Sequence, residues 1–177
     1  MKNIEVELRS FITEDKYKEL LNFFDLNGEF KSKNNQETFY FDCKEDLRIQ
    51  KNDDYAKVWM KKGNMHDEAR EEIEIRFEKE DFNKMEKLFL SLGYDVDIKW
   101  FRTRYSYSWQ GIDVSVDDTR GYGYIIELEI LSDEKDKDKN LDYLKSKMSE
   151  LGVISSSKDE FVSKFDIYKN FWKDLIK

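Results

Sequence analysis

The chain has 177 residues, a formal net charge of −8, one cysteine and one histidine. Its length is typical of a single domain, residues 1–177, that is large enough to bury a substantial core. The negative charge argues against binding a nucleic-acid polymer or an anionic membrane, because both attract cationic proteins. The cysteine and histidine counts exclude a disulfide framework and argue against a Cys/His zinc site or a Ser-His-Asp triad.

Charged residues make up 40% of the chain, but 15% aromatic and 39% hydrophobic residues argue against disorder. The N-terminus lacks the basic and apolar regions of a signal peptide, and no apolar run approaches the ~20 residues of a membrane span. We therefore expect a folded cytoplasmic protein, without membrane contact, that has either a highly ionic surface or an ionic interior.

The N-terminal half predicts a strand, a helix and a series of further strands. Alternating apolar and charged residues predict the first strand over residues 3–11. The helical spacing of Tyr17, Leu20 and Phe24 then predicts an amphipathic helix that Thr13 caps. Further strands are predicted in QETFYFDC, DLRIQK, YAKVWMKK and AREEIEIRF, which turn-prone runs separate.

The C-terminal half predicts more strands between helices. The segment DFNKMEKLFLSLG predicts a helix with Asp81 as its N-cap and Gly93 at its end. Two strands should meet at a reversal formed by Gln110 and Gly111, and YGYIIELEI predicts another. After a charged loop, DEKDKDKN, two helices are expected in LDYLKSKMSELG and residues 158–176. This order indicates an α+β fold whose antiparallel sheet could curl into a barrel.

Three of the predicted strands alternate apolar residues with paired acids. In IEVELR, Glu5 and Glu7 share one face of the extended chain with Arg9, and the apolar residues share the other. The alternation recurs in EEIEIRF and IIELEI, so the paired acids are Glu5 and Glu7, Glu72 and Glu74, and Glu127 and Glu129.

Basic residues follow the same logic. Arg102 and Arg104 lie two apart in FRTRY, so both guanidinium groups share one face of a strand. The other candidate cations in or beside the strands are Arg48, Lys57, Lys62 and Arg70.

The charged faces could point outward or inward. Outward, they would be the solvated surface of an ordinary core. Inward, about six to eight carboxylates and as many cations would share a barrel, which is costly unless ions and ligands compensate them. Mg²⁺ and Mn²⁺ favour carboxylate oxygens, whereas arginine and lysine match phosphate oxygens. The inward orientation therefore predicts a site for a metal-bound polyphosphate.

These motifs resemble those of the CYTH superfamily, also called triphosphate tunnel metalloenzymes. IEVELR is similar to the family's Glu-x-Glu-x-Lys motif, with Arg9 in place of the lysine. Arg102-Thr103-Arg104 matches its Lys/Arg-x-Arg motif, and KKG matches its Lys-Gly at Lys62 and Gly63. In VDDTRGYGYIIELE, the family's Asp, Gly-x-Gly and Glu-x-Glu fall on Asp117, Gly121, Gly123, Glu127 and Glu129. The resemblance spans Glu5 to Glu129, and the order and spacing of the motifs make it specific.

The resemblance implies an eight-stranded antiparallel β-barrel that forms a tunnel, with flanking helices. It also implies one or two divalent metal ions, Mg²⁺ or Mn²⁺. The implied metal ligands are Glu5, Glu7, Glu72, Glu74, Asp117, Glu127 and Glu129. The implied triphosphate-binding residues are Arg9, Arg48, Lys57, Lys62, Arg70, Arg102 and Arg104. We expect Glu5, Glu7, Lys57, Lys62 and Arg102 to take the most direct part in catalysis.

One position departs from the family pattern. The family often has Arg-x-Arg where this chain has Arg48-Ile49-Gln50. The missing arginine should weaken binding of a terminal phosphate unless Lys51 or Lys57 substitutes for it.

Three functions are consistent with these residues. The first is metal-dependent hydrolysis of an inorganic or organic triphosphate, in which water attacks a phosphoryl group in line. The second is a class IV adenylyl cyclase, which converts ATP to cyclic AMP and pyrophosphate. The third is a polyphosphate- or nucleotide-binding module without turnover. In each case the partner is a small triphosphate, and assembly as a monomer or a homodimer stays open.

Overall fold

The computed structural model describes residues 4–61 and 72–177, with the side chains of residues 5–60 and 73–177. The described residues form one eight-stranded antiparallel sheet in the order β1-β8-β7-β6-β2-β3-β4-β5. The strands are β1 (Ile4–Ile12), β2 (Glu29–Phe41), β3 (Asp46–Lys51), β4 (Ala56–Lys61), β5 (Glu72–Phe77), β6 (Val96–Trp109), β7 (Ile112–Thr119) and β8 (Gly123–Ser132). This confirms the predicted α+β fold.

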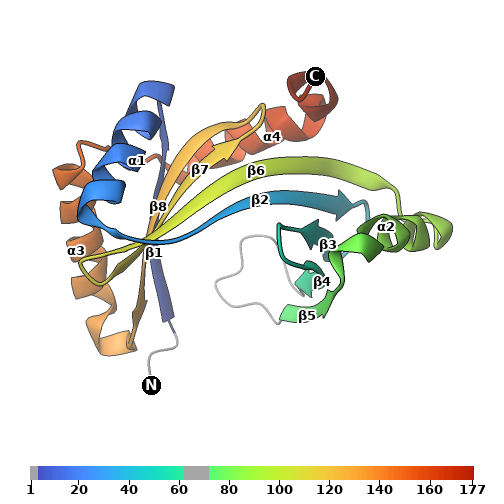
Figure 1. Ribbon diagram of the computed structural model, residues 1–177, viewed down its shortest axis with the longest axis horizontal. Helices are drawn as coiled ribbons and strands as arrows, with labels where there is room; N and C mark the ends of the chain where they lie inside the picture. Colours follow the sequence, from blue (N-terminus) through green and yellow to red (C-terminus); the bar gives the residue numbers. More distant parts are fainter. Residues whose placement is uncertain (1–3, 62–71) are drawn as a thin grey trace.

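The sheet is strongly curled but not closed by hydrogen bonds. Strands β1 and β5 stand at its two ends, and no ladder joins them within the described parts of the chain. Figure 1 shows the long strands β2 and β6 arching from the β1–β8 end toward β3, β4 and β5. The curl gives the sheet an inner and an outer face, as the tunnel fold requires.

The helices that the structure describes are α1 (Glu14–Asn27), α2 (Phe82–Ser91), α3 (Lys137–Glu150) and α4 (Lys158–Leu175). Short 3-10 helices, Lys79–Asp81 and Glu134–Asp136, precede α2 and α3. Helices α1 and α3 flank the β1–β8 end, and α2 lies at the opposite end beside β3 (Figure 1).

The first three helices cover the outer face with apolar contacts. Phe24 of α1 and Met148 of α3 join a buried cluster with Val6 of β1, Val114 of β7 and Leu128 of β8. At the other end, Phe82 of α2 packs against Phe39, Ile49 and Ala56. Because side chains alternate along a strand, the acids beside these apolar residues point to the inner face. The inward orientation of the charged faces is therefore the observed one.

Helix α4 behaves differently, because it packs against the inner face at one end of the sheet. The ring of Phe161 stacks on Phe11 of β1 with 4.4 Å between centroids. Further along the helix, Tyr168 lies edge-on to Trp100 of β6, and its hydroxyl donates to the Lys99 carbonyl at 2.8 Å. Helix α4 thus covers the end of the inner face that lies beside the β7–β8 turn.

Most local predictions agree with the structure. Thr13 caps α1 by accepting from the backbone N–H of Lys16 at 3.2 Å, as expected. Gln110 and Gly111 adopt positive φ angles of 53° and 79°, which matches a two-residue hairpin turn.

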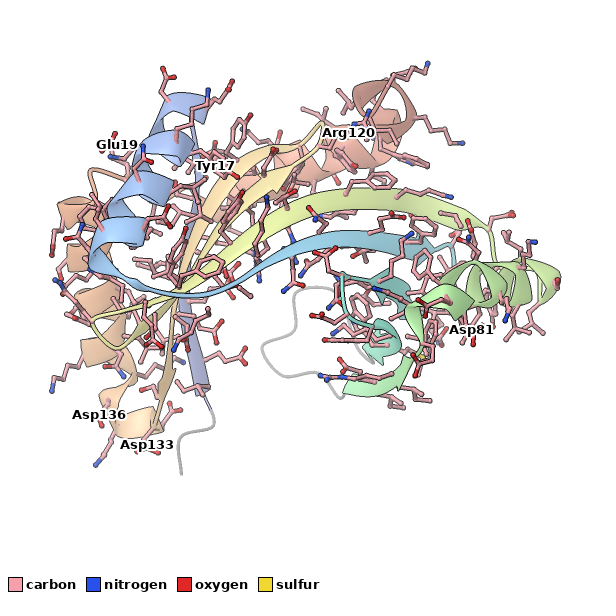
Figure 2. The ribbon with its side chains drawn as sticks, in the orientation of Figure 1. Tyr17, Glu19, Asp81, Arg120, Asp133 and Asp136 are labelled. Carbon is pink, nitrogen blue, oxygen red and sulfur yellow. The ribbon has the colours of Figure 1, made fainter. Side chains whose placement is uncertain are left out.

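Two local predictions are correct only in part. Asp81, which Figure 2 labels beside α2, occupies the predicted N-cap position but makes no side-chain capping bond; its carboxylate accepts from Lys84 instead. The charged run at residues 133–140 is not a loop throughout, because it contains a 3-10 turn and the first turn of α3. Alternating charges three and four residues apart favour a helix there. Among the described helices, none has the length and apolar character needed to cross a bilayer.

The β7–β8 turn provides a test of how α4 is held. Gly121 has a φ of +74°, and a Cβ added there would lie 2.8 Å from both the Cβ and the carbonyl oxygen of Leu175. We expect Gly121→Ala to lower the free energy of unfolding by about 2–4 kcal/mol, because backbone strain and a clash combine. Gly111→Ala is the control, since Gly111 has a φ of +79° but no atom within 4 Å.

This control should cost only about 1–2 kcal/mol. Urea denaturation of the two variants measures the difference. Equal losses would mean that the contact between the turn and α4 contributes nothing to stability.

Candidate functional site

Three carboxylates converge on the inner face where β1 meets β8. Glu7 of β1 lies directly opposite Glu129 of β8, and Glu127 is opposite Arg9 in the same ladder. One carboxylate oxygen from each of Glu7, Glu127 and Glu129 lies within 4.8 Å of the others. A divalent cation favours such a set of oxygen ligands.

Two of these acids, Glu7 and Glu129, have raised pKa values. Burial, together with the charges of Glu5 and Glu127, raises the pKa of Glu129 to about 7. Burial and the charge of Glu127 also raise the pKa of Glu7, which Arg9 only partly offsets from 3.2 Å. The cluster is therefore short of positive charge, and a bound cation would relieve this repulsion.

Two arginines of β6 share one carboxylate beside this cluster. Asp117 of β7 lies opposite Arg104 and is 2% exposed. Arg104 donates to both of its carboxylate oxygens, at 2.8 and 2.7 Å, and Arg102 reaches Oδ2 at 3.3 Å. Arg104 also lies 3.6 Å from Glu127, so it connects the arginines to the three acids.

Burial and pairing act on these guanidinium groups in opposite directions. Burial lowers the pKa of Arg102. Burial alone would also lower the pKa of Arg104, but its hydrogen bonds to Asp117 outweigh this effect and raise it. Both arginines remain cations at neutral pH. Asp117 thus serves two guanidinium groups, and Glu127 is a second acid in contact with Arg104.

The far wall of the inner face is formed by β3, β4 and β5. Lys57 of β4 donates to Glu74 of β5 at 2.7 Å, which lowers the pKa of that carboxyl group. Gln50 of β3, at the position where the family often has arginine, donates to Thr38 at 2.8 Å. Arg48 of β3 is paired with Asp46 through two hydrogen bonds of 2.6 and 2.7 Å.

The structure brings most, but not all, of the predicted site residues together. Asp117, implied as a metal ligand, contacts the arginines and is not among the three clustered carboxylates. Glu5 lies close enough to act on Glu129 electrostatically, although its side chain is exposed. Lys62, Arg70 and the side chain of Glu72 lie outside the described residues.

Lys51 cannot replace the missing arginine. Its ammonium group lies over the Phe82 ring and pairs with Glu37 at 3.0 Å, both on the outer face. Of the two substitutes considered, Lys57 is the one whose side chain lies on the inner face, opposite Gln50.

Sequence patterns missed several polar residues that hold the site. Gln36 of β2 accepts from Nε and Nη2 of Arg102 at 2.9 and 2.5 Å. Asp46 and Tyr40 likewise contact Arg48. Alternation along the strand could have placed these residues on the inner face, because every second side chain of QETFYFDC, from Gln36 through Thr38 to Tyr40, shares a face. Without the register against β6 and β3, however, their partners could not be named.

Comparisons with known proteins agree with this geometry. A sequence model described as the CYTH domain matches residues 3–161. MJ0240 of Methanocaldococcus jannaschii, provisionally named an adenylate cyclase, is 34% identical over 172 residues, which cover 91% of this chain and 95% of that protein.

Solved structures share the fold. PH1819 of Pyrococcus horikoshii is 25% identical, with a TM-score of 0.65 over 90% of this chain and 98% of its own. A conserved protein of Pyrococcus furiosus is 27% identical, with a TM-score of 0.64 over 85% and 91%. HpAC1 of Hippeastrum, provisionally an adenylyl cyclase and described as having a dominant triphosphatase activity, is 18% identical, with a TM-score of 0.63 over 88% and 92%. The extent of the sequence match, together with the curled sheet and its charged inner face, shows that this chain belongs to the CYTH family.

Proposed function

We propose that this protein hydrolyses a triphosphate with the help of a divalent metal ion. The observation that carries the proposal is the direct contact between an acidic cluster and an arginine pair, 3.6 Å apart at Glu127 and Arg104. Metal-bound polyphosphate requires both kinds of side chain, since cations bind carboxylates and phosphate oxygens bind guanidinium groups.

The acidic cluster fits a hard divalent cation such as Mg²⁺ or Mn²⁺. Glu7, Glu127 and Glu129 would supply its oxygen ligands. Burial and the neighbouring acids raise the pKa of Glu129, and a bound cation would offset both effects. Glu5 is positioned to strengthen the field on the cation. When bound, such an ion neutralises phosphate charge and lowers the pKa of a coordinated water.

The arginines would bind and orient the phosphate chain. Gln36 and Asp117 accept hydrogen bonds from two sides of the Arg102 guanidinium, and Asp117 accepts from that of Arg104. Fixed donors of this kind stabilise charge on a transferred phosphoryl group without reorganising. Helix α4 would exclude water from one end of the inner face, because its aromatic side chains pack there.

A second candidate activity is the conversion of ATP to cyclic AMP and pyrophosphate. The observation that favours it is the 34% identity to MJ0240, which is provisionally named an adenylate cyclase. Both reactions would use the same cation and arginines, and they differ in which phosphorus is attacked. A binding module without turnover is the remaining alternative.

Product analysis separates these alternatives. We expect the protein with Mg²⁺ or Mn²⁺ to release orthophosphate from tripolyphosphate, thiamine triphosphate or ATP, and EDTA to abolish the release. Cyclic AMP with pyrophosphate from ATP would establish the cyclase instead. Tight tripolyphosphate binding in calorimetry, without product under either metal, would identify a binding module and contradict both activities.

Exchanging Arg104 tests the role of the arginine pair on β6. Arg104→Lys keeps the charge but loses the two-pronged geometry, so we expect kcat/KM for the best triphosphate to fall by about 10–100-fold. The matched control is Lys51→Gln, which removes a cation from the outer face and should change kcat/KM by less than about twofold. If Arg104→Lys changed kcat/KM no more than Lys51→Gln does, the two-pronged geometry of Arg104 would contribute nothing to activity.

Removing one acid tests the repulsion in the cluster. The pKa of Glu129 is raised in the folded state, so its ionisation destabilises the metal-free protein as the pH rises from about 4.5 through 7. We expect Glu129→Gln to be more stable than the wild type at pH 8 by roughly 1–2 kcal/mol, allowing for partial exposure. The advantage should vanish near pH 4.5, where the wild-type carboxyl is protonated.

Urea denaturation in EDTA at both pH values measures this difference, with the exposed Glu78→Gln as control. Added Mg²⁺ should then stabilise the wild type more than Glu129→Gln. A Glu129→Gln variant less stable than the wild type at pH 8 would contradict the repulsion.

A further inference from the structure

One arginine on the inner face is already held by a carboxylate of its own strand. Asp46 and Arg48 lie two apart on β3, so their side chains share a face. Nε of Arg48 donates to Oδ1 of Asp46 at 2.6 Å, and Nη2 donates to Oδ2 at 2.7 Å. The side chain of Asp46 is only 8% exposed and that of Arg48 is 18% exposed. The pair is therefore a two-pronged ion pair largely removed from water.

Aromatic rings fix the guanidinium group in this position. The Tyr40 ring lies 4.3 Å from Cζ of Arg48, and the Trp59 ring lies 5.6 Å from it. Nη1 also donates to the Tyr40 hydroxyl at 3.3 Å. Such cation–π contacts hold the arginine on the inner face whether or not Asp46 is charged.

The two walls of the inner face differ in how carboxylates are matched to arginines. On β6, Asp117 accepts from the Nε and Nη2 edge of Arg104 and is shared with Arg102. On β3, Asp46 accepts from the same edge of Arg48, so a two-pronged contact between that edge and a phosphate is already taken. A phosphate that used this edge would have to displace Asp46, and a buried carboxylate that loses a cationic partner is costly.

We propose that Asp46 competes with the substrate for Arg48 and so weakens the hold of the β3 wall on a triphosphate. This inference rests on the proposed function, because it assumes that the phosphate chain lies along the inner face. Asp46 is then a specificity-determining residue that shifts the binding of phosphate away from the β3 wall. Gln50 acts in the same direction, since it contributes an amide in place of a cation.

The test uses imidotriphosphate, a tripolyphosphate analogue with non-hydrolysable P–N–P bridges, in calorimetry with Mg²⁺. We expect Asp46→Asn to bind it about tenfold more tightly than the wild type, because the carboxylate no longer competes. The dissociation constant of Asp46→Asn should also rise more steeply with salt, as expected when a cation engages the anion directly.

The matched control is Asp97→Asn. Asp97 lines the same cavity of about 240 Å³ as Asp46, but it pairs with Lys169 at 2.7 Å. It therefore reports the general effect of removing one negative charge at this end of the sheet, which should be less than about threefold. If Asp46→Asn bound no more tightly than Asp97→Asn, competition by Asp46 would be refuted.

A second variant keeps the test informative if Asp46→Asn does not fold. Asp46→Ser also removes the carboxylate and leaves Arg48 intact, so we expect the same gain in affinity, about tenfold over the wild type. Binding that is tenfold or more weaker than that of the wild type would mean that Asp46 supports Arg48 in binding phosphate, which overturns the proposal. Failure of the wild type to bind the analogue would instead overturn the proposed function and this inference together.

Discussion

The alternation of side chains along the strands is the constraint on which the rest of the structure depends. Val6 and Leu128 point to the helices on the outer face, so Glu7 and Glu129 must point inward. The same parity brings Arg102 and Arg104 to the inner face of β6. A shift of one residue in any of these ladders would exchange the ionic and apolar faces, and the apolar core enforces the observed register.

Charges concentrated in this way need partners, and the chain provides them unevenly. Asp117 is satisfied by two arginines, and Glu74 by Lys57 and Arg76. Glu7 and Glu129, in contrast, keep raised pKa values, because burial and neighbouring acids outweigh the nearby cations. A cluster of acids short of positive charge beside two partly buried arginines is the arrangement that a metal-bound polyanion would balance.

The sequence allowed the strands and their faces to be predicted, and so which charged side chains share the inner face, because period-two alternation is a local property. It could not predict which charges pair, since pairing depends on register between distant strands. Gln36 is 66 residues from Arg102, and nothing local marks it as the residue that holds that guanidinium. Asp81 shows that a local pattern can also mislead. Its sequence position favours a capping hydrogen bond, but its carboxylate accepts from Lys84 instead. The conformation of the charged run before α3 was missed for a similar reason, since loops and exposed helices share its composition.

Helix α4 packs at one end of the inner face, so the two ends of that face differ. The acids lie toward one end of β1 and β8, whereas Phe11, near the other end of β1, stacks on Phe161 of α4. Arg9 stands between them, 3.2 Å from Glu7 and 4.7 Å from the Phe161 ring. The aromatic contacts of α4 therefore adjoin the charged residues directly, with the Phe161 ring against one side of Arg9. Because charge interactions strengthen as water is excluded, a ligand that covered the exposed side of Arg9 would strengthen its interaction with that guanidinium.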